Sequence, residues 1–289
     1  MRVLVAGWFS FDEFIATVGD ELGADVVVGW LRELGIDHDV AWAPYFQRGP
    51  NWRNVDPADY THLVFVSGPL FDLPELRQLS AAFAGAQRWA VNVSVVSDAG
   101  RALFDRVWER DAPGMARPDL AGGTTTPDVP VLAVAFAPPQ EEYGARSQAD
   151  RVRGVLEDWL RARAMPWFEL DMDLYEKPYD RFPSQVEALV RRADVVVSMR
   201  LHALVLGLAH GVPVIACDGV VGGAKVSAQA AALGWPLALT AGEIDAHALD
   251  AALEHALSGT LADPIAAAQR RMREGNAEAR AWFTRQLGR

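Results

Sequence analysis

Short runs of β-branched and other apolar residues alternate with longer helical patterns through the first half of the chain. A buried strand has a continuous apolar run, whereas a helix repeats its apolar residues every three to four positions. The strand-like runs are residues 2–6, 40–43, 63–67 and 89–96, and the helical stretches are 22–34, 74–83 and 99–110. This alternation predicts βαβ units and a parallel sheet.

The alternation stops at residues 110–130, "RDAPGMARPDLAGGTTTPDVP", and then resumes. Pro, Gly and Thr remove all periodicity there, which is typical of a domain boundary. Beyond it, strands are predicted at 131–136, 167–170, 194–198, 212–216 and 237–239, and helices at 148–164, 184–192, 201–210, 224–233 and 246–257. Residues 264–287 are predicted to form one long closing helix.

The pattern therefore predicts an α/β protein with two Rossmann-like lobes, each built on a parallel sheet, and a cleft between them. We place the first lobe at residues 1–120 and the second at 121–289, with the last helix as a candidate to pack back on the first lobe. Ligands of open α/β sheets bind beyond the carboxyl ends of the strands. Residues that directly follow strands are therefore the first candidates for a site.

Composition and charge narrow the classes of function. Of the 289 residues, 51% are hydrophobic and 22% charged, as in ordinary globular proteins. The net charge of −11 argues against a nucleic-acid partner, which would require a basic surface. The best candidate for a membrane span, residues 203–217, is interrupted by His210 and Pro213, so no transmembrane segment is expected.

Cys217 is the only cysteine, which excludes an internal disulfide and a cysteine-based metal cluster. No residues show the spacing of metal ligands, so no metal is expected. The N-terminal apolar run is too short for a secretory signal. We therefore expect a cytoplasmic protein.

The segment 193–226, "ADVVVSMRLHALVLGLAHGVPVIACDGVVGGAKV", contains the strongest candidate chemistry. Ser198 ends a valine-rich strand and can cap the helix that follows. Arg200 and His202 then lie at that helix N-terminus, where free N–H groups and the helix dipole favour an anion. Arg200 can bind a carboxylate or phosphate in bidentate geometry, and His202 can donate a proton near neutral pH. The alternative is that both residues only cap the helix or form salt bridges.

A glycine-rich turn follows the next strand. Gly222 and Gly223 precede Lys225 at a helix start, an arrangement suited to one phosphate group. The turn is not a Walker A motif, because Ala224 replaces the last glycine and Val226 replaces the Ser or Thr that binds Mg²⁺. The alternative is a surface turn with a solvated lysine.

Two segments resemble the polysaccharide pyruvyl transferases. "SMRLHALVLGLAHGVPVIACD" is similar to the family signature, in which "RLH" precedes a helix of small residues and a "GVPVI" strand. That family continues with a Tyr-Asp-Pro-Lys-Val-like turn, to which Asp218 and Lys225 correspond across an insertion. "GWFSFDEFIATVGDE" resembles the family's opening strand and Asn-Gly-Asp-Glu element, with Thr17 in place of the Asn.

This resemblance implies two lobes arranged as in GT-B glycosyltransferases, with phosphoenolpyruvate as donor, a saccharide or similar acceptor and no cofactor. Arg200 would hold the donor's carboxylate or phosphate, Leu201 would offer its backbone N–H, and His202 would protonate the methylene carbon. The family also places an arginine after the first strand of the second lobe, where this chain has Ala137. Arg146 or Arg151 in the adjoining loop could replace it.

The acceptor is expected at the first lobe. Trp8, Phe9 and Phe11 follow the first strand and could stack on a sugar beside Asp12, although aromatic residues more often belong to a core. Asp20 could act as a base toward an acceptor hydroxyl, or cap the helix predicted at residue 22.

Two other functions stay open at this point. A GT-B glycosyltransferase or nucleotide-sugar enzyme would use Arg200 and the glycine turn for a diphosphate, with Asp218 or Glu243 binding a ribose. A non-catalytic protein that binds anions or sugars could keep the same fold. Assembly as a homo-oligomer is compatible with all three.

Overall fold

The computed structural model describes residues 1–14, 16–123, 127–163, 165–174 and 182–288, and it divides into two compact units. Unit 1 comprises Met1–Pro127 and unit 2 comprises Asp128–Arg289. The division falls inside the Pro-, Gly- and Thr-rich segment, after Pro127 rather than after Leu120. Among the described helices, none combines the length and apolar character needed to cross a bilayer.

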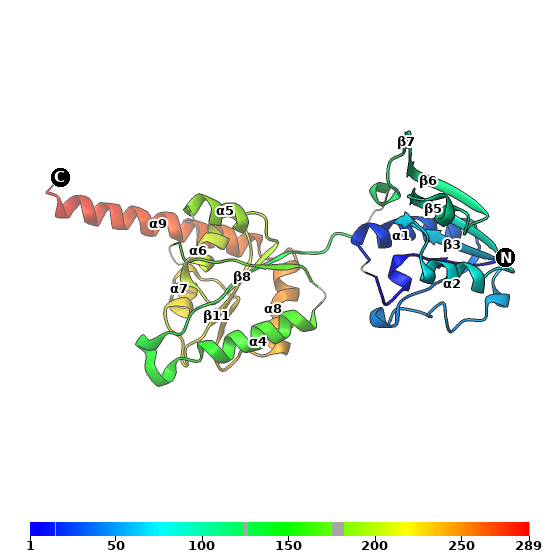
Figure 1. The fold of residues 1–289 in the computed structure, drawn as a ribbon. Coiled ribbons are helices and arrows are strands. Elements are labelled where there is room, and N and C mark those ends of the chain that lie inside the picture. The colour runs from blue at the N-terminus through cyan, green and yellow to red at the C-terminus, as the bar shows by residue number, and fades with distance from the viewer. Residues whose placement is uncertain (15, 124–126, 164, 175–181, 289) are drawn as a thin grey trace. The chain divides into compact units, whose positions relative to one another are not determined.

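Unit 1 has one twisted sheet with helices on both faces (Figure 1). Its strands are β1 (Arg2–Ala6), β2 (Asp37–Val40), β3 (His62–Val66), β4 (Pro69–Leu70), β5 (Gln87–Val95), β6 (Arg106–Ala112) and β7 (Met115–Ala116), and its helices are α1 (Val18–Glu33), α2 (Pro74–Ala82) and α3 (Asp98–Arg101). The strand order is β2-β1-β3-β5-β6-β7, with β4 also paired to β5, and the β6–β7 pair is antiparallel while the others are parallel.

The two faces of this sheet carry separate cores, because successive side chains of a strand point to opposite faces. Leu4 and Leu63 belong to the cluster that includes residues of α2, whereas Val3 and Val64 belong to the cluster that includes residues of α1. The continuous apolar runs in the sequence thus reflect strands that are buried on both faces.

Unit 2 has a fully parallel sheet of five strands in the order β12-β11-β10-β8-β9. The strands are β8 (Leu132–Ala135), β9 (Trp167–Glu169), β10 (Val195–Ser198), β11 (Val214–Asp218) and β12 (Ala238–Thr240), and the helices are α4 (Ala149–Ala162), α5 (Pro183–Val190), α6 (Leu201–Ala209), α7 (Lys225–Leu233), α8 (Ala246–Leu257) and α9 (Ala262–Gln286). In chain order this is the 2-1-3-4-5 arrangement of a doubly wound fold, whose switch point lies between β8 and β10.

The predicted fold class of two Rossmann-like lobes with parallel sheets is confirmed. The predicted cleft and GT-B arrangement of the lobes stay predictions. The helix predicted at 99–110 is wrong beyond Arg101: α3 ends at Arg101 and Arg106–Ala112 form β6. Asp105 accounts for the change, because its carboxylate binds the Arg88 guanidinium and its backbone N–H donates to the Arg88 carbonyl oxygen, which starts a strand beside β5.

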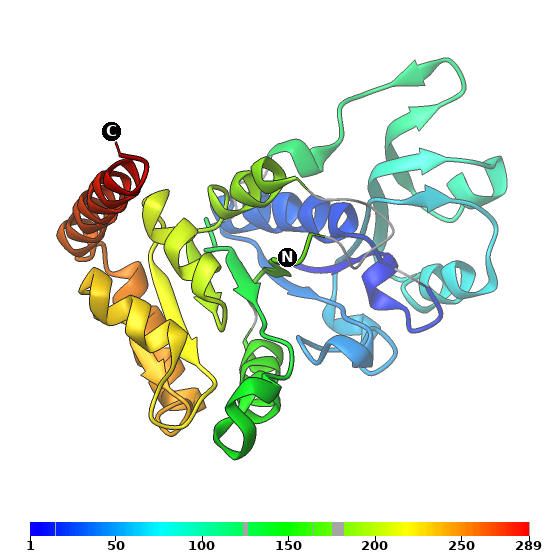
Figure 2. The same cartoon turned by 90° about the vertical axis from the view of Figure 1, so that its left-hand side faces the viewer.

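The closing helix α9 packs against α6 and α7 of its own unit, as both views show (Figure 1, Figure 2). Two of its side chains bind carbonyl oxygens at the C-terminal ends of those helices. Gln269 Nε2 donates to Leu208 O at 3.0 Å, and Arg271 Nη1 donates to Leu233 O at 2.6 Å. These bonds satisfy carbonyls that the helices themselves leave free. Packing of α9 on unit 1 stays a prediction.

Candidate functional site

The switch point of unit 2 carries a pocket of about 510 Å³. The loops after β8, β9 and β10 and the start of α7 contribute its walls. This is where doubly wound sheets bind ligands, because the loops after β8 and β10 leave the sheet toward opposite faces. The lining residues are Pro138, Pro139, Gln140, Glu142, Asp173, Arg200, Leu201, His202 and Lys225.

Arg200 is fixed at the N-cap of α6 in extended conformation. Its N–H donates to Ser198 Oγ at 2.9 Å, and the same hydroxyl donates to the Arg200 carbonyl oxygen at 2.7 Å. Ser198 therefore holds the backbone of Arg200, one residue before the helical turn it was predicted to cap. The guanidinium makes a bidentate contact with Asp173, at 2.5 Å to Oδ1 and 3.3 Å to Oδ2.

Leu201 and His202 are the first two residues of α6 and also line the pocket. The His202 side chain is exposed and has no hydrogen-bond partner among the residues that the structure describes. An imidazole without a protein partner at a helix N-terminus is available to a ligand that enters the pocket. His210 lies at the opposite end of the helix, where it is the C-cap and its Nε2 lies 3.4 Å from Glu187 Oε2.

The glycine turn brings Lys225 to the same pocket. Gly222 and Gly223 have φ angles of +76° and +79°, a conformation that side chains with a Cβ rarely adopt. The turn ends at α7, whose first residue is Lys225. Lys225 Nζ lies 3.5 Å from Glu142 Oε1, in a pair that solvent reaches from both sides.

Asp218 corrects one prediction, because its carboxylate binds the protein's own backbone rather than facing the pocket. It is only 2% exposed. Its oxygens accept from the N–H groups of Val220 at 3.1 Å, Ala224 at 2.7 Å and Ser227 at 2.8 Å. These bonds shape the glycine turn and cap α7, so Asp218 is a structural carboxylate.

We expect Asp218→Ala to lower the free energy of unfolding of unit 2 by about 2–4 kcal/mol, since it removes a helix cap and leaves buried N–H groups unpaired. Urea unfolding followed by circular dichroism measures the change. Asp150→Ala is the control, because Asp150 is exposed in the first turn of α4. Equal stability of the two variants would contradict the assignment.

Glu243, the other residue considered for a ribose, is likewise used locally. Its Oε2 accepts from Thr240 N at 2.8 Å and from Thr240 Oγ1 at 2.7 Å, and these bonds lower the pKa of the carboxyl.

Cys217 is buried beside the switch-point strands, and burial raises the pKa of its thiol to about 12. A thiol held neutral in this way is a poor nucleophile.

The two arginines expected to replace the missing arginine at position 137 have different surroundings in the structure. Ala137 is buried, with 4% of its surface exposed. Arg151 donates to Gln148 Oε1 and to the Ala241 carbonyl oxygen, and it is not among the residues that line the pocket. Arg146 lies 5.8 Å from the Tyr143 ring centre, and Lys225 Nζ lies 6.0 Å from the same ring. Arg146 is therefore the arginine that stays close to the pocket.

Two charged residues of the pocket were not singled out from the sequence. Asp173 and Glu142 come from the loops after β9 and β8, and each pairs with a cation of the pocket. The same rule that selected Arg200, that residues beyond strand ends form sites, applies to Asp173. The sequence does not give the strand order, and only the strand order shows that these loops are neighbours.

The aromatic residues after β1 are core residues, which corrects their assignment to acceptor stacking. Phe9 and Phe11 are 0% and 1% exposed, and Trp8 is 5% exposed. Trp8 and Phe11 pack in the α2-side core and Phe9 packs in the α1-side core. Their ring faces are taken by other side chains and offer no surface to a sugar.

Asp20 belongs to a capping box that starts α1 at Val18, four residues before the predicted start. Its Oδ2 accepts from Thr17 N at 2.8 Å and from Thr17 Oγ1 at 2.9 Å. The helix-capping alternative therefore describes Asp20, at the third helical position rather than the N-cap. Asp12 is exposed, and beyond β2 so is Tyr45, with 85% of its surface accessible.

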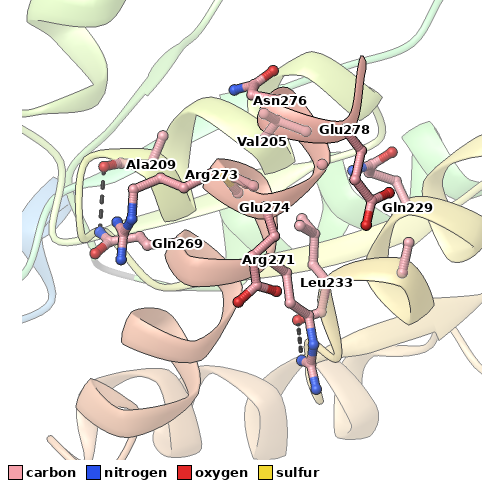
Figure 3. A pocket seen from close by; sticks show the side chains of 13 residues that line it. Val205, Ala209, Gln229, Leu233, Gln269, Arg271, Arg273, Glu274, Asn276 and Glu278 are labelled. Atoms are coloured by element: carbon pink, nitrogen blue, oxygen red, sulfur yellow. Dashed lines mark hydrogen bonds between the residues drawn. The ribbon is translucent and has the colours of Figure 1, made fainter. Parts of the chain in front are cut away.

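A second pocket, of about 760 Å³, lies between α9 and the ends of α6 and α7 (Figure 3). Its two best-placed polar side chains, Gln269 and Arg271, are turned to the carbonyl oxygens of those helices. They are therefore committed to holding α9. Among the described residues, no group of three or more His, Cys, Asp or Glu side chains is placed to hold a metal.

Three solved structures align with the chain at low TM-score. The first is a glycotransferase of kitacinnamycin, with 14% identity over 99% of this chain and 98% of that chain and a TM-score of 0.37. The second is the glycosyltransferase SnogD from Streptomyces nogalater, with 14% identity over 95% of this chain and 96% of that chain and a TM-score of 0.31. The third is the E. coli ADP-heptose lps heptosyltransferase II, with 11% identity over 89% of this chain and 99% of that chain and a TM-score of 0.26. These alignments carry no weight in assigning a substrate.

No curated protein sequence matches the chain. Residues 117–219, by contrast, match the family model described as polysaccharide pyruvyl transferase. The matched segment contains β8, β10, α6 and the Arg200-Leu201-His202 triplet of the pocket. Through these residues the chain is similar to the polysaccharide pyruvyl transferase family, and the match covers the pocket triplet within residues 117–219.

Proposed function

We propose that this transferase takes the enolpyruvyl unit of phosphoenolpyruvate and attaches it to two hydroxyls of a saccharide acceptor as a ketal. The observation that carries the proposal is the convergence of Arg200, His202 and Lys225 in one pocket at the switch point of unit 2. Two cations suit a donor that carries both a carboxylate and a phosphate. The His202 imidazole supplies an acid in the same pocket, and the scheme requires no cofactor.

In this scheme Arg200 binds one anionic group of the donor in bidentate fashion, and Lys225 binds the other as a point charge. The Leu201 N–H, at the start of α6, adds a hydrogen bond to the bound phosphoenolpyruvate. His202 gives its proton to the methylene carbon of phosphoenolpyruvate, and the adjacent carbon becomes oxocarbenium-like. The fixed cations hold the anionic groups while this positive centre forms.

An acceptor hydroxyl then attacks that carbon and releases its proton. The carbon–oxygen bond to phosphate breaks, phosphate leaves with the bonding pair, and a second hydroxyl closes the ketal. One of the two hydroxyl protons returns to His202, and the other leaves with phosphate or solvent. Protons and electrons therefore balance without an oxidant or a further reactant.

The acceptor side is proposed to be unit 1. Support comes from exposed groups beyond β1 and β2, namely Asp12 and the ring of Tyr45. They replace the three buried rings as candidates for contact with a sugar. A cytoplasmic location fits a donor that is an intracellular metabolite.

Isothermal titration of the full chain with phosphoenolpyruvate, UDP and a UDP-sugar tests the donor. We expect phosphoenolpyruvate to bind and the nucleotides to bind at least about tenfold more weakly, a difference of about 1.4 kcal/mol. The glycosyltransferase alternative loses support because Asp218 and Glu243 bind their own loops. Binding of UDP without binding of phosphoenolpyruvate would nevertheless establish that alternative.

A further inference from the structure

Among the residues that the structure describes, both cations that line the switch-point pocket are already paired, and each partner is a carboxylate that lines the same pocket. Asp173 binds Arg200, and Glu142 binds Lys225. With both pairs formed, the four groups sum to zero charge, so a donor with two anionic groups meets no free cation among them. The donor can bind these two cations only if the two carboxylates move away from them.

The solvent exposure of the two carboxylates indicates that they can move away from the cations. The Asp173 and Glu142 side chains are 47% and 58% exposed, so water takes over their solvation when they turn away. Exposed ion pairs contribute little to stability, and a charge-assisted contact to phosphate or carboxylate is stronger. Asp218 is the contrast within the same unit, since its burial and three backbone hydrogen bonds fix it.

We propose that Asp173 and Glu142 are displaceable competitors that occupy the two anion-binding cations until the donor arrives. The inference rests on the proposed function for the identity of the donor, but not for the competition itself. The two carboxylates stand in for the donor's two acid groups. They thereby set specificity, because a ligand with a single anionic group releases only one of the two cations.

The test measures dissociation constants for phosphoenolpyruvate and, separately, for inorganic phosphate. Variants are Asp173→Asn, Glu142→Gln and the double variant. We expect Asp173→Asn to tighten phosphoenolpyruvate binding about two- to fivefold and Glu142→Gln up to about threefold, the range that removal of an exposed ion pair allows. The double variant should approach the product of the two factors, since the pairs share no group.

Glu141→Gln is the matched control, because Glu141 is an exposed neighbour outside the pocket lining. It reports the effect of removing one negative charge from the same loop. An affinity in Asp173→Asn equal to that in Glu141→Gln, or weaker than in the unmodified protein, would overturn the competition. The weaker result would make Asp173 a positioning residue for Arg200.

The phosphate arm separates this inference from the proposed donor. Tighter phosphate binding in the variants, together with no binding of phosphoenolpyruvate in any of them, would refute the proposed function and keep the competition. Binding of phosphoenolpyruvate with no gain over the Glu141→Gln control would do the reverse. Unchanged urea midpoints establish that each variant is folded.

Discussion

Replacement of Arg200 by methionine should weaken the binding of phosphoenolpyruvate about 30- to 1,000-fold. The change removes a bidentate, charge-assisted contact from a partly enclosed site, a loss of about 2–4 kcal/mol. Arg200 is 22% exposed and its backbone is held by Ser198, so the guanidinium is delivered to the pocket in a defined position. Titration calorimetry on the full chain measures the loss.

Two further variants interpret this result. Arg200→Lys keeps the charge without the fork of donors, so its affinity should lie between those of the unmodified protein and Arg200→Met. Arg161→Met is the control, because Arg161 is 69% exposed on α4 and pairs only with Asp158 among the described residues. An affinity in Arg200→Met that matches this control would remove Arg200 from the donor site.

Replacement of His202 by glutamine should lower kcat about 10²–10⁴-fold, the usual contribution of a general acid. Donor affinity should change by less than about threefold, because Arg200 and Lys225 remain. Release of phosphate in the presence of a competent acceptor measures turnover, and calorimetry measures donor binding. This split between turnover and binding distinguishes proton transfer from a loss of folding or of the anion site.

His210→Gln is the matched control on the same helix. His210 closes α6 at its C-terminal end and lies near Glu187, outside the pocket. Its replacement should leave turnover within about twofold. Turnover of His202→Gln that equals that of His210→Gln would exclude His202 as the acid and would favour a non-catalytic anion-binding role for the pocket.

The strand positions and the chemistry of residues 193–226 could be predicted from the sequence because both depend on local pattern. A valine run at Val195–Val197 forms a strand buried on both faces, and a helix must begin after Ser198 to cover it. Arg200 and His202 consequently lie at a strand end and helix start in any fold that uses this segment. Their resemblance to the signature of a known family added the proposed donor and the proposed mechanism.

Other assignments failed because the competing explanation was also local and the sequence could not decide between them. Asp218 could face a ligand or its own backbone, and the structure decided for the backbone, because the carboxylate is buried at the end of β11 and accepts from backbone N–H groups. Trp8, Phe9 and Phe11 could be a stacking surface or a core, and the helices that cover both faces of the sheet made them core.

By itself, the sequence determined two α/β units and a candidate anion-binding triplet at the end of one strand, since helical and strand periodicity are properties of neighbouring residues. Only the tertiary structure decided what meets that triplet. Asp173 follows β9, Glu142 follows β8 and Lys225 begins α7, and these positions converge because the strand order places β8 between β9 and β10. Strand order is set by long-range packing of helices on the sheet, so no local pattern encodes which carboxylates pair with Arg200 and Lys225.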